Sequence, residues 1–159
     1  MNYKIIVLAP SCGGKSSLMR YLREHTGLHI AETDEEVMKA NNDVWPDNDH
    51  KNKILVPQTT NEIITRENVI YFASYIPEDL LLKAKQKGFK IVILEVPIKV
   101  LNERNEKRMA EEKYDDVSPW FRGQLDNFKV LKSKGIAKYS INGNQVIEKI
   151  AKDLKTFVE

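Results

Sequence analysis

The chain has 159 residues, the length of one typical domain, so we expect a single unit over residues 1–159. Its 25 Lys and Arg nearly balance its 23 Asp and Glu, and a net charge of +2 lacks the clustered basic excess of nucleic-acid-binding proteins. The 42% hydrophobic fraction excludes a wholly disordered chain, while the longest apolar run, residues 5–9, is far below the roughly 18 residues that span a bilayer. No signal-peptide pattern opens the chain, and the single Cys12 fits a reducing compartment, so we expect a cytoplasmic protein.

The first half of the chain alternates apolar runs with helical patterns. The predicted elements are a strand over 1–8, a helix over 15–25, a strand over 28–31, a helix over 34–40, a polar loop over 41–52, a helix over 60–67 and a strand over 69–73. The first strand is continuously apolar, which is typical of a parallel strand covered on both faces.

The second half continues the alternation. It predicts a helix over 77–87, a strand over 90–96, a helix over 98–113, an acidic break over 114–117, a further helix to about 134, a strand over 137–141 and a helix over 144–158. Ser118 and Pro119 suit the N-cap and first helical position of the helix after the acidic break. Strands alternating with helices predict an α/β layer fold with a parallel sheet.

Ligands of such sheets bind beyond the carboxyl ends of the strands. Ala9, Asp34, Ser74 and Pro97 each follow closely on a predicted strand, so we expect them on one rim. This rim is where we look for chemistry.

Residues 9–16, with the sequence APSCGGKS, carry the strongest signal. They fit the phosphate-loop pattern G-x-x-x-x-G-K-[ST], with Ala9 in place of the first glycine, and they follow a strand and open a helix. Glycines let backbone N–H groups cradle phosphates, and the helix N-terminus adds positive potential. Lys15 can reach the β- and γ-phosphates, and the Ser16 hydroxyl can bind Mg²⁺. The nucleotide-binding residues predicted here are Pro10, Ser11, Cys12, Gly13, Gly14, Lys15, Ser16 and Ser17.

With this loop and element order, the sequence resembles the small phosphate-loop kinases, such as shikimate kinase, gluconate kinase and the adenylate and nucleoside monophosphate kinases. The resemblance covers nearly the whole chain. It implies a three-layer P-loop NTPase fold, a five-stranded parallel sheet flanked by helices, and a small lid over about residues 109–118. It also implies ATP as the phosphoryl donor, with Mg²⁺.

A second match to these kinases lies at Glu32-Thr33-Asp34, at the end of the second predicted strand. Shikimate-kinase-like enzymes carry Asp-x-Asp there, with the first carboxylate on the metal side and the second on the acceptor hydroxyl. The resemblance thus implies a metal role for Glu32, which departs from the Asp of the pattern, and an acceptor role for Asp34. The alternative is that Thr33 or Asp34 simply caps the following helix.

The helix after the fourth predicted strand carries Arg104 and Arg108, which share a face because they are four residues apart. Similar kinases place arginines here, at the base of the lid, where guanidinium groups neutralise charge on the transferring phosphoryl group. The resemblance therefore implies a catalytic role for both, nucleotide binding by Arg104, and completion of the clamp by Arg122. The alternative is a solvated face, since acidic residues surround the two arginines.

The acceptor pocket is expected within residues 35–76. Arg66 could hold an anionic group of the acceptor, and Trp45 or Tyr75 could stack on a ring. The chain lacks the Gly-Gly-Gly run that shikimate kinases carry after the third strand, and it lacks the Asp-Gly-x-Pro-Arg pattern of adenylate kinase.

We therefore predict an ATP-dependent phosphotransferase for a small-molecule acceptor, foremost a nucleoside or nucleoside monophosphate, otherwise a shikimate-like or sugar-acid-like alcohol. Two alternatives stay open. One is a kinase of the 5′-hydroxyl of a polynucleotide, which the near-neutral charge disfavours. The other is a switch protein that binds and slowly hydrolyses ATP without an acceptor. The sequence predicts neither a membrane partner nor an oligomeric state.

Overall fold

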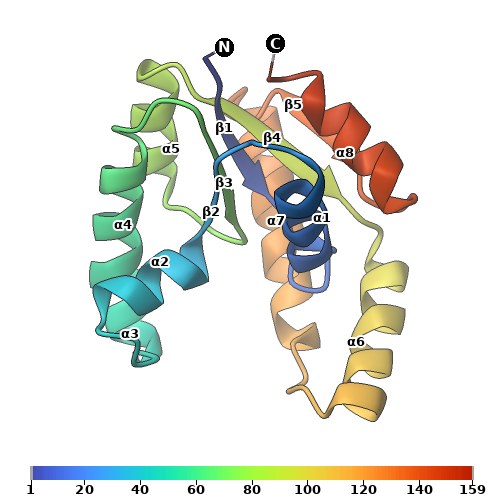
Figure 1. Cartoon of the computed structure of the whole chain (residues 1–159). Coiled ribbons are helices and arrows are strands. Elements are labelled where there is room, and N and C mark those ends of the chain that lie inside the picture. Colours follow the sequence, from blue (N-terminus) through green and yellow to red (C-terminus); the bar gives the residue numbers. More distant parts are fainter. Residues whose placement is uncertain (1, 159) are drawn as a thin grey trace.

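The computed structural model describes residues 2–158. Five parallel strands form one sheet in the order β2-β3-β1-β4-β5, so the first strand of the chain lies at its centre (Figure 1). The strands are β1 (Lys4–Leu8), β2 (Ile30–Glu32), β3 (Val69–Ala73), β4 (Lys90–Glu95) and β5 (Tyr139–Asn142). The predicted five-stranded parallel sheet is confirmed.

Helices cover both faces of this sheet and complete a three-layer α/β fold. They are α1 (Lys15–His25), α2 (Thr33–Ala40), α3 (Asn48–His50), a π-helical turn η1 (Lys51–Leu55), α4 (Val56–Ile63), α5 (Glu78–Gln86), α6 (Ile98–Glu112), α7 (Ser118–Ser133) and α8 (Ile147–Lys155). One buried cluster joins the sheet to α4, α5 and α7, and a second joins the other face to α1 and α8. Within residues 2–158, every helix is too short or too polar to cross a bilayer.

Strand β1 shows why its sequence is continuously apolar. Ile6 and Leu8 belong to the cluster under α4, α5 and α7, whereas Ile5 and Val7 belong to the cluster under α1 and α8. All four are at most 1% exposed, because successive side chains of a strand point to opposite faces and helices cover both. Burial on both faces fixes the strand that carries the phosphate loop.

The predicted loop over residues 41–52 is partly wrong. The side chain of Asp47 accepts a hydrogen bond from the backbone N–H of His50 at 2.8 Å, and helical structure begins directly after Asp47. It continues through α3, η1 and α4 to Ile63, so the helix predicted over 60–67 begins twelve residues earlier than expected. Asparagines and aspartates read as a loop, but here one aspartate caps a helix.

Pro57 also obscures this helix in the sequence. Proline has no N–H to donate to the carbonyl four residues earlier. The helix widens just before it, and the N–H of Val56 donates to the carbonyl of Lys51, five residues back. Such π-helical turns are rare and frequently occur at functional sites.

The lid predicted over residues 109–118 is only partly a loop, because its first four residues belong to helix α6. Helix α6 continues to Glu112, and only residues 113–117 form the loop before α7. Two exposed aromatic residues mark this end of the molecule: Tyr114 in the loop is 54% exposed, and Trp120 in the first turn of α7 is 60% exposed.

The base of the loop over 113–117 is held by polar contacts that the sequence does not indicate. Buried Asn105 donates through Nδ2 to Asp116 Oδ1 at 2.8 Å and accepts from the N–H of Val117 at 3.1 Å. Asp116 Oδ1 also accepts from the N–H of Ser118 at 2.9 Å. The prediction of Ser118 as N-cap is therefore wrong: Val117 holds that position, and Asp116 satisfies the first helical amide.

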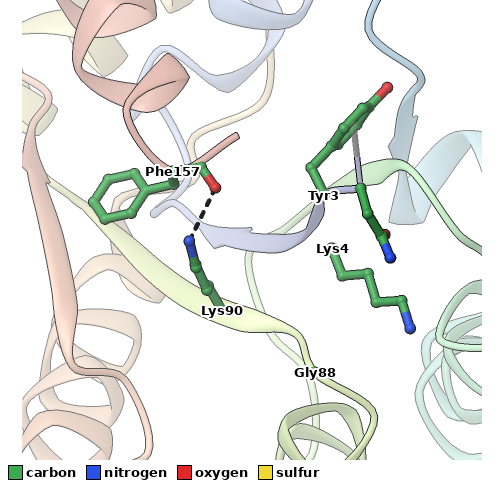
Figure 2. Close-up of a pocket in the computed structure, with 6 residues that line it drawn as sticks. Tyr3, Lys4, Gly88, Lys90 and Phe157 are labelled. Carbon is green, nitrogen blue, oxygen red and sulfur yellow. Dashed lines mark hydrogen bonds between the residues drawn. The ribbon is translucent and has the colours of Figure 1, made fainter. Parts of the chain in front are cut away.

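The amino ends of the strands face away from the phosphate loop and form a basic edge. A hollow of about 230 Å³ lies there, lined by Asn2 and by the five residues labelled in Figure 2, which are Tyr3, Lys4, Gly88, Lys90 and Phe157. The ammonium groups of three lysines donate to carbonyls at or just beyond helix carboxyl ends: Lys4 to Lys87 at 3.0 Å, Lys85 to Gly135 at 2.8 Å, and Lys90 to Phe157 at 3.2 Å. These cations complement the negative ends of α5, α7 and α8.

Candidate functional site

The phosphate-loop sequence connects the carboxyl end of β1 to the first turn of α1, at the centre of the sheet (Figure 1). Cys12 and Gly14 have positive φ angles of 62° and 89°. The N–H of Gly13 donates to the carbonyl of Pro10 at 2.8 Å, and a Cβ atom on Gly13 would meet that oxygen at 2.7 Å. The adjacent glycines are therefore required by the tight turn, and this turn is typical of an anion-binding backbone nest.

Two arginines of α6 reach the tip of this loop. Arg104 donates through Nη1 to the carbonyl of Cys12 at 3.0 Å and through Nη2 to the carbonyl of Gly143 at 3.4 Å. Arg108 donates through Nη1 to Cys12 Sγ at 3.4 Å, and its guanidinium lies 4.3 Å from the ring centroid of Tyr114. Both arginines thus contact the tip of the phosphate loop instead of extending freely into solvent.

Gln124 of α7 is a third contact to the loop tip. Its Oε1 accepts from the N–H of Ser11 at 2.8 Å, and its Nε2 donates to Ser11 Oγ at 3.0 Å. No sequence signal marks this residue, because it lies 113 positions from its partner. Gln124 reaches Ser11 because α7 packs beside the loop. Cys12 of the loop contacts the apolar cluster that contains Phe121 of α7.

Lys15 and Glu32 face each other beside the loop. Lys15 Nζ lies 4.0 Å from Glu32 Oε2, and their side chains are 15% and 11% exposed. Burial raises the pKa of the Glu32 carboxyl above its ordinary value, and the nearby Lys15 ammonium opposes that rise. Glu32 also accepts from the backbone N–H of Asp34, so Glu32 caps α2, in contrast to the capping by Thr33 or Asp34 that the sequence left open.

Asp34 lies at the start of α2 and meets a cation that the sequence did not indicate. Lys51 Nζ is 3.1 Å from Asp34 Oδ1 and 4.7 Å from the ring centroid of Trp45. The carbonyl of Lys51 accepts the five-residue hydrogen bond of η1, so the widened helical turn begins at the residue that pairs with Asp34. Helical periodicity could not locate it, because the turn breaks that periodicity.

The two remaining predicted arginines, Arg66 for the acceptor and Arg122 for the clamp and substrate, differ in their surroundings. Arg66 lies 2.8 Å from Glu62 and 3.8 Å from Glu36, so carboxylates already surround its guanidinium. Arg122 is exposed on α7, two residues before Gln124. Tyr75, the second predicted stacking residue, is 51% exposed just after β3.

The predicted metal side consists of Ser16, in the first turn of α1, and Glu32. Within residues 2–158, the structure contains no cluster of three or more His, Cys, Asp or Glu side chains suited to a metal ion. One hydroxyl and one carboxylate beside a phosphate loop fit Mg²⁺, because that ion usually takes few protein ligands and keeps waters and substrate phosphate oxygens.

No protein-family model matches the sequence, and no curated protein matches it. Solved structures do match. The shikimate kinase of Acinetobacter baumannii in complex with shikimate superposes with a TM-score of 0.75 at 17% identity, over 98% of this chain and 92% of that chain. A gluconokinase of Sinorhizobium meliloti 1021 has a TM-score of 0.65 at 18% identity, over 95% and 88% of the two chains.

A third similar structure is the YorR protein of Bacillus subtilis in complex with phosphorylated GDP. Its TM-score is 0.64 at 21% identity, and the match covers 97% of this chain and 94% of that chain. Each of these three matches spans at least 88% of both chains, at identities of 17–21%. This chain has the three-layer fold of the small phosphate-loop kinases.

Proposed function

We propose that this chain is an ATP-dependent kinase that transfers the γ-phosphoryl group to a small-molecule acceptor. The observation that carries the proposal is the convergence of charged side chains from three elements on one loop: Lys15 from α1, Glu32 from β2, and Arg104 and Arg108 from α6. Phosphoryl transfer is catalysed mainly by positioning and by neutralising charge, and such a set supplies both.

On the donor side, the backbone N–H groups of residues 14–17, at the start of α1, and the Lys15 ammonium bind the phosphates of ATP. Arg104 and Arg108 neutralise the charge that spreads over the transferring phosphoryl group. Ser16 and Glu32 would hold Mg²⁺, which would add further neutralisation of the phosphate oxygens. Closure of the region around residues 113–117 excludes water, the competing acceptor.

On the acceptor side, Asp34 orients the acceptor hydroxyl and receives its proton as the oxygen attacks the γ-phosphorus. Lys51 lies beside this carboxylate, and the half-exposed ring of Trp45 lies against the Lys51 ammonium. A nucleoside suits this set of side chains, because it offers a hydroxyl to Asp34 and a ring to Trp45. A nucleoside monophosphate is the related choice. Its phosphate needs no base, so Asp34 would only position it.

The molecules bound in two similar structures suggest two classes of acceptor to test. The complex of YorR with phosphorylated GDP supports a nucleotide-type acceptor, and the complex of shikimate kinase with shikimate supports a hydroxylated acid. Lys51, and Arg66 once released from its carboxylates, could meet an anionic group in either class. We place nucleosides and nucleoside monophosphates first, and shikimate-like or sugar-acid-like alcohols second.

The test is ADP production from ATP and Mg²⁺ with a panel of acceptors. The panel holds nucleosides, nucleoside monophosphates, shikimate, sugar acids and a short 5′-hydroxyl oligonucleotide. We expect one acceptor class to raise ADP release well above the rate with water. Lys15→Ala should lower that rate at least about 100-fold, and Asp34→Asn about 10²- to 10⁴-fold if the acceptor is a hydroxyl. Lys129→Ala, an exposed lysine of α7, is the matched control and should keep full activity.

Other results redirect the proposal. Salt-sensitive phosphorylation of the oligonucleotide alone would make the chain a polynucleotide kinase. Binding of ATP with no acceptor that raises turnover would overturn the nucleotide preference and favour a switch protein. Absence of ATP binding would overturn the proposal altogether.

A further inference from the structure

The tip of the phosphate loop needs support from outside the loop. Cys12 has a φ of 62°, a conformation that residues with a side chain seldom adopt. The residue before it, Ser11, makes both of its contacts with one side chain, since Gln124 binds its N–H at 2.8 Å and its Oγ at 3.0 Å. Gln124 therefore fixes both the backbone and the side chain of the residue that precedes the unusual turn.

These two hydrogen bonds also determine which donors of the loop stay free. The N–H of Ser11 is turned to Gln124, and the N–H of Gly13 is turned to Pro10. Ser11 Oγ accepts from Gln124, which leaves the hydroxyl hydrogen of Ser11 available to donate elsewhere. The neutral amide of Gln124 can accept from the N–H and donate to the Oγ of Ser11 at the same time. It adds no charge near a bound polyphosphate, whereas the guanidinium groups of Arg104 and Arg108 do.

We propose that Gln124 is a positioning residue for nucleotide binding, which holds Ser11, and through it Cys12, in the conformation that receives the phosphates. The inference rests on the proposed function, because it assumes that the loop binds ATP. Helix α7 starts where the loop over residues 113–117 ends, so Gln124 also links the lid region to the phosphate loop.

The test uses Gln124→Met, which keeps the length and neutrality of the side chain but removes both hydrogen bonds. The first measurement is the Kd for ATP and for ADP with Mg²⁺ by calorimetry. The second is the rate at which a neutral maleimide labels Cys12 without nucleotide. We expect Kd to rise about 5- to 30-fold, as the loss of one or two neutral hydrogen bonds implies, and labelling to accelerate about threefold or more.

Two further variants separate positioning from a general loss of structure. Ser11→Ala removes only the Oγ partner, so Gln124→Met should raise Kd less in that background than in the wild type. Gln124→Glu can accept from both the N–H and the O–H of Ser11, so it should label at a rate within about twofold of wild type. Asn127→Ala, an amide three residues further along α7, is the matched control and should change neither readout.

The outcomes distinguish the inference from the function it rests on. Wild-type affinity for ATP in Gln124→Met, or a lowered melting temperature with unchanged Kd and labelling, would overturn the positioning role. Failure of the wild type to bind ATP would overturn the proposed function instead. If Gln124→Met does not fold, equal labelling of Ser11→Ala, Gln124→Glu and the wild type would count against the inference.

Discussion

Glu32 combines burial, a cationic neighbour and a cap on a helix in one carboxylate. Its side chain is 11% exposed and lies 4.0 Å from the ammonium of Lys15. Burial is the larger influence and raises the pKa of Glu32, so the folded chain holds this proton more tightly than the unfolded chain does. Ionised Glu32 is tolerated because Lys15 and the N–H of Asp34 face it.

This raised pKa predicts a pH dependence of stability. From the ordinary value of 4.5 up to the folded pKa, the unfolded chain loses its proton first, so the free energy of unfolding falls as pH rises through that window. Each tenfold weakening of the acid corresponds to about 1.4 kcal/mol. Glu32→Gln should remove this component, which urea unfolding of both proteins between pH 4 and pH 8 would measure. Parallel pH curves for the two proteins would contradict the assignment.

Candidate site residues could be proposed from the sequence where they belong to a local pattern. Lys15 and Ser16 were proposed from eight consecutive residues, and Glu32 and Asp34 from the resemblance of Glu32-Thr33-Asp34 to the Asp-x-Asp of shikimate-kinase-like enzymes. Lys51 and Gln124 were not predictable, because each acquires its partner only when distant segments pack together. Their residue types carry no spacing signal of their own.

Gly143 and Gly123 should respond in opposite ways to substitution by alanine, because the space around them differs. A Cβ on Gly143, after β5, would meet Val96 Cγ2 at 2.7 Å and Leu94 Cγ at 3.0 Å. A Cβ on Gly123, in exposed α7, would meet nothing within 4 Å. Gly143→Ala should therefore lower the free energy of unfolding by about 1–3 kcal/mol, and Gly123→Ala should raise it by about 0.5–1 kcal/mol. Denaturant unfolding of the two variants tests the signs, and a shift in the same direction would refute the placement of one glycine.

The loop between α6 and α7 depends on one buried amide. Asn105 is 4% exposed and contacts both Asp116 and the N–H of Val117. Asn105→Ala should cost about 1–3 kcal/mol, because it leaves these groups without their partner. Limited proteolysis should then cut residues 113–117 faster than in the wild type. Asn102→Ala, an exposed asparagine of the same helix, is the control, and equal cleavage of both variants would reject the role of Asn105.

The elements themselves were largely predictable, and the misses have physical causes. The bounds of α1 and β3 match those predicted, because glycines or apolar runs delimit them clearly. The helical stretch from Asn48 to Ile63 was misplaced, since Asp47 caps it and Pro57 widens it, and both residues are read in sequence as breakers.

At the scale of the molecule, the carboxyl ends and the amino ends of the strands carry different groups. The carboxyl edge carries the candidate site, and the amino edge carries lysines bound to helix ends. Lys85→Met should lower the free energy of unfolding by about 0.3–1 kcal/mol at low salt, and less at 1 M salt, where the charge is screened. ATP affinity should not change. Lys129→Met is the control, and an equal effect of both substitutions would remove the special role of the helix end.

The chain has two tryptophans, which lie in different segments of the fold. Trp45 is half exposed beside Lys51 on the acceptor side, and Trp120 is exposed in the first turn of α7. Replacing either one by phenylalanine would leave a single tryptophan, whose emission can be excited at wavelengths where the tyrosines barely absorb. If Trp45 stacks on the acceptor as proposed, its emission alone would report acceptor binding, and emission from Trp120 alone would report movement of α7. The order of events in one catalytic cycle could then be followed optically without attaching a dye.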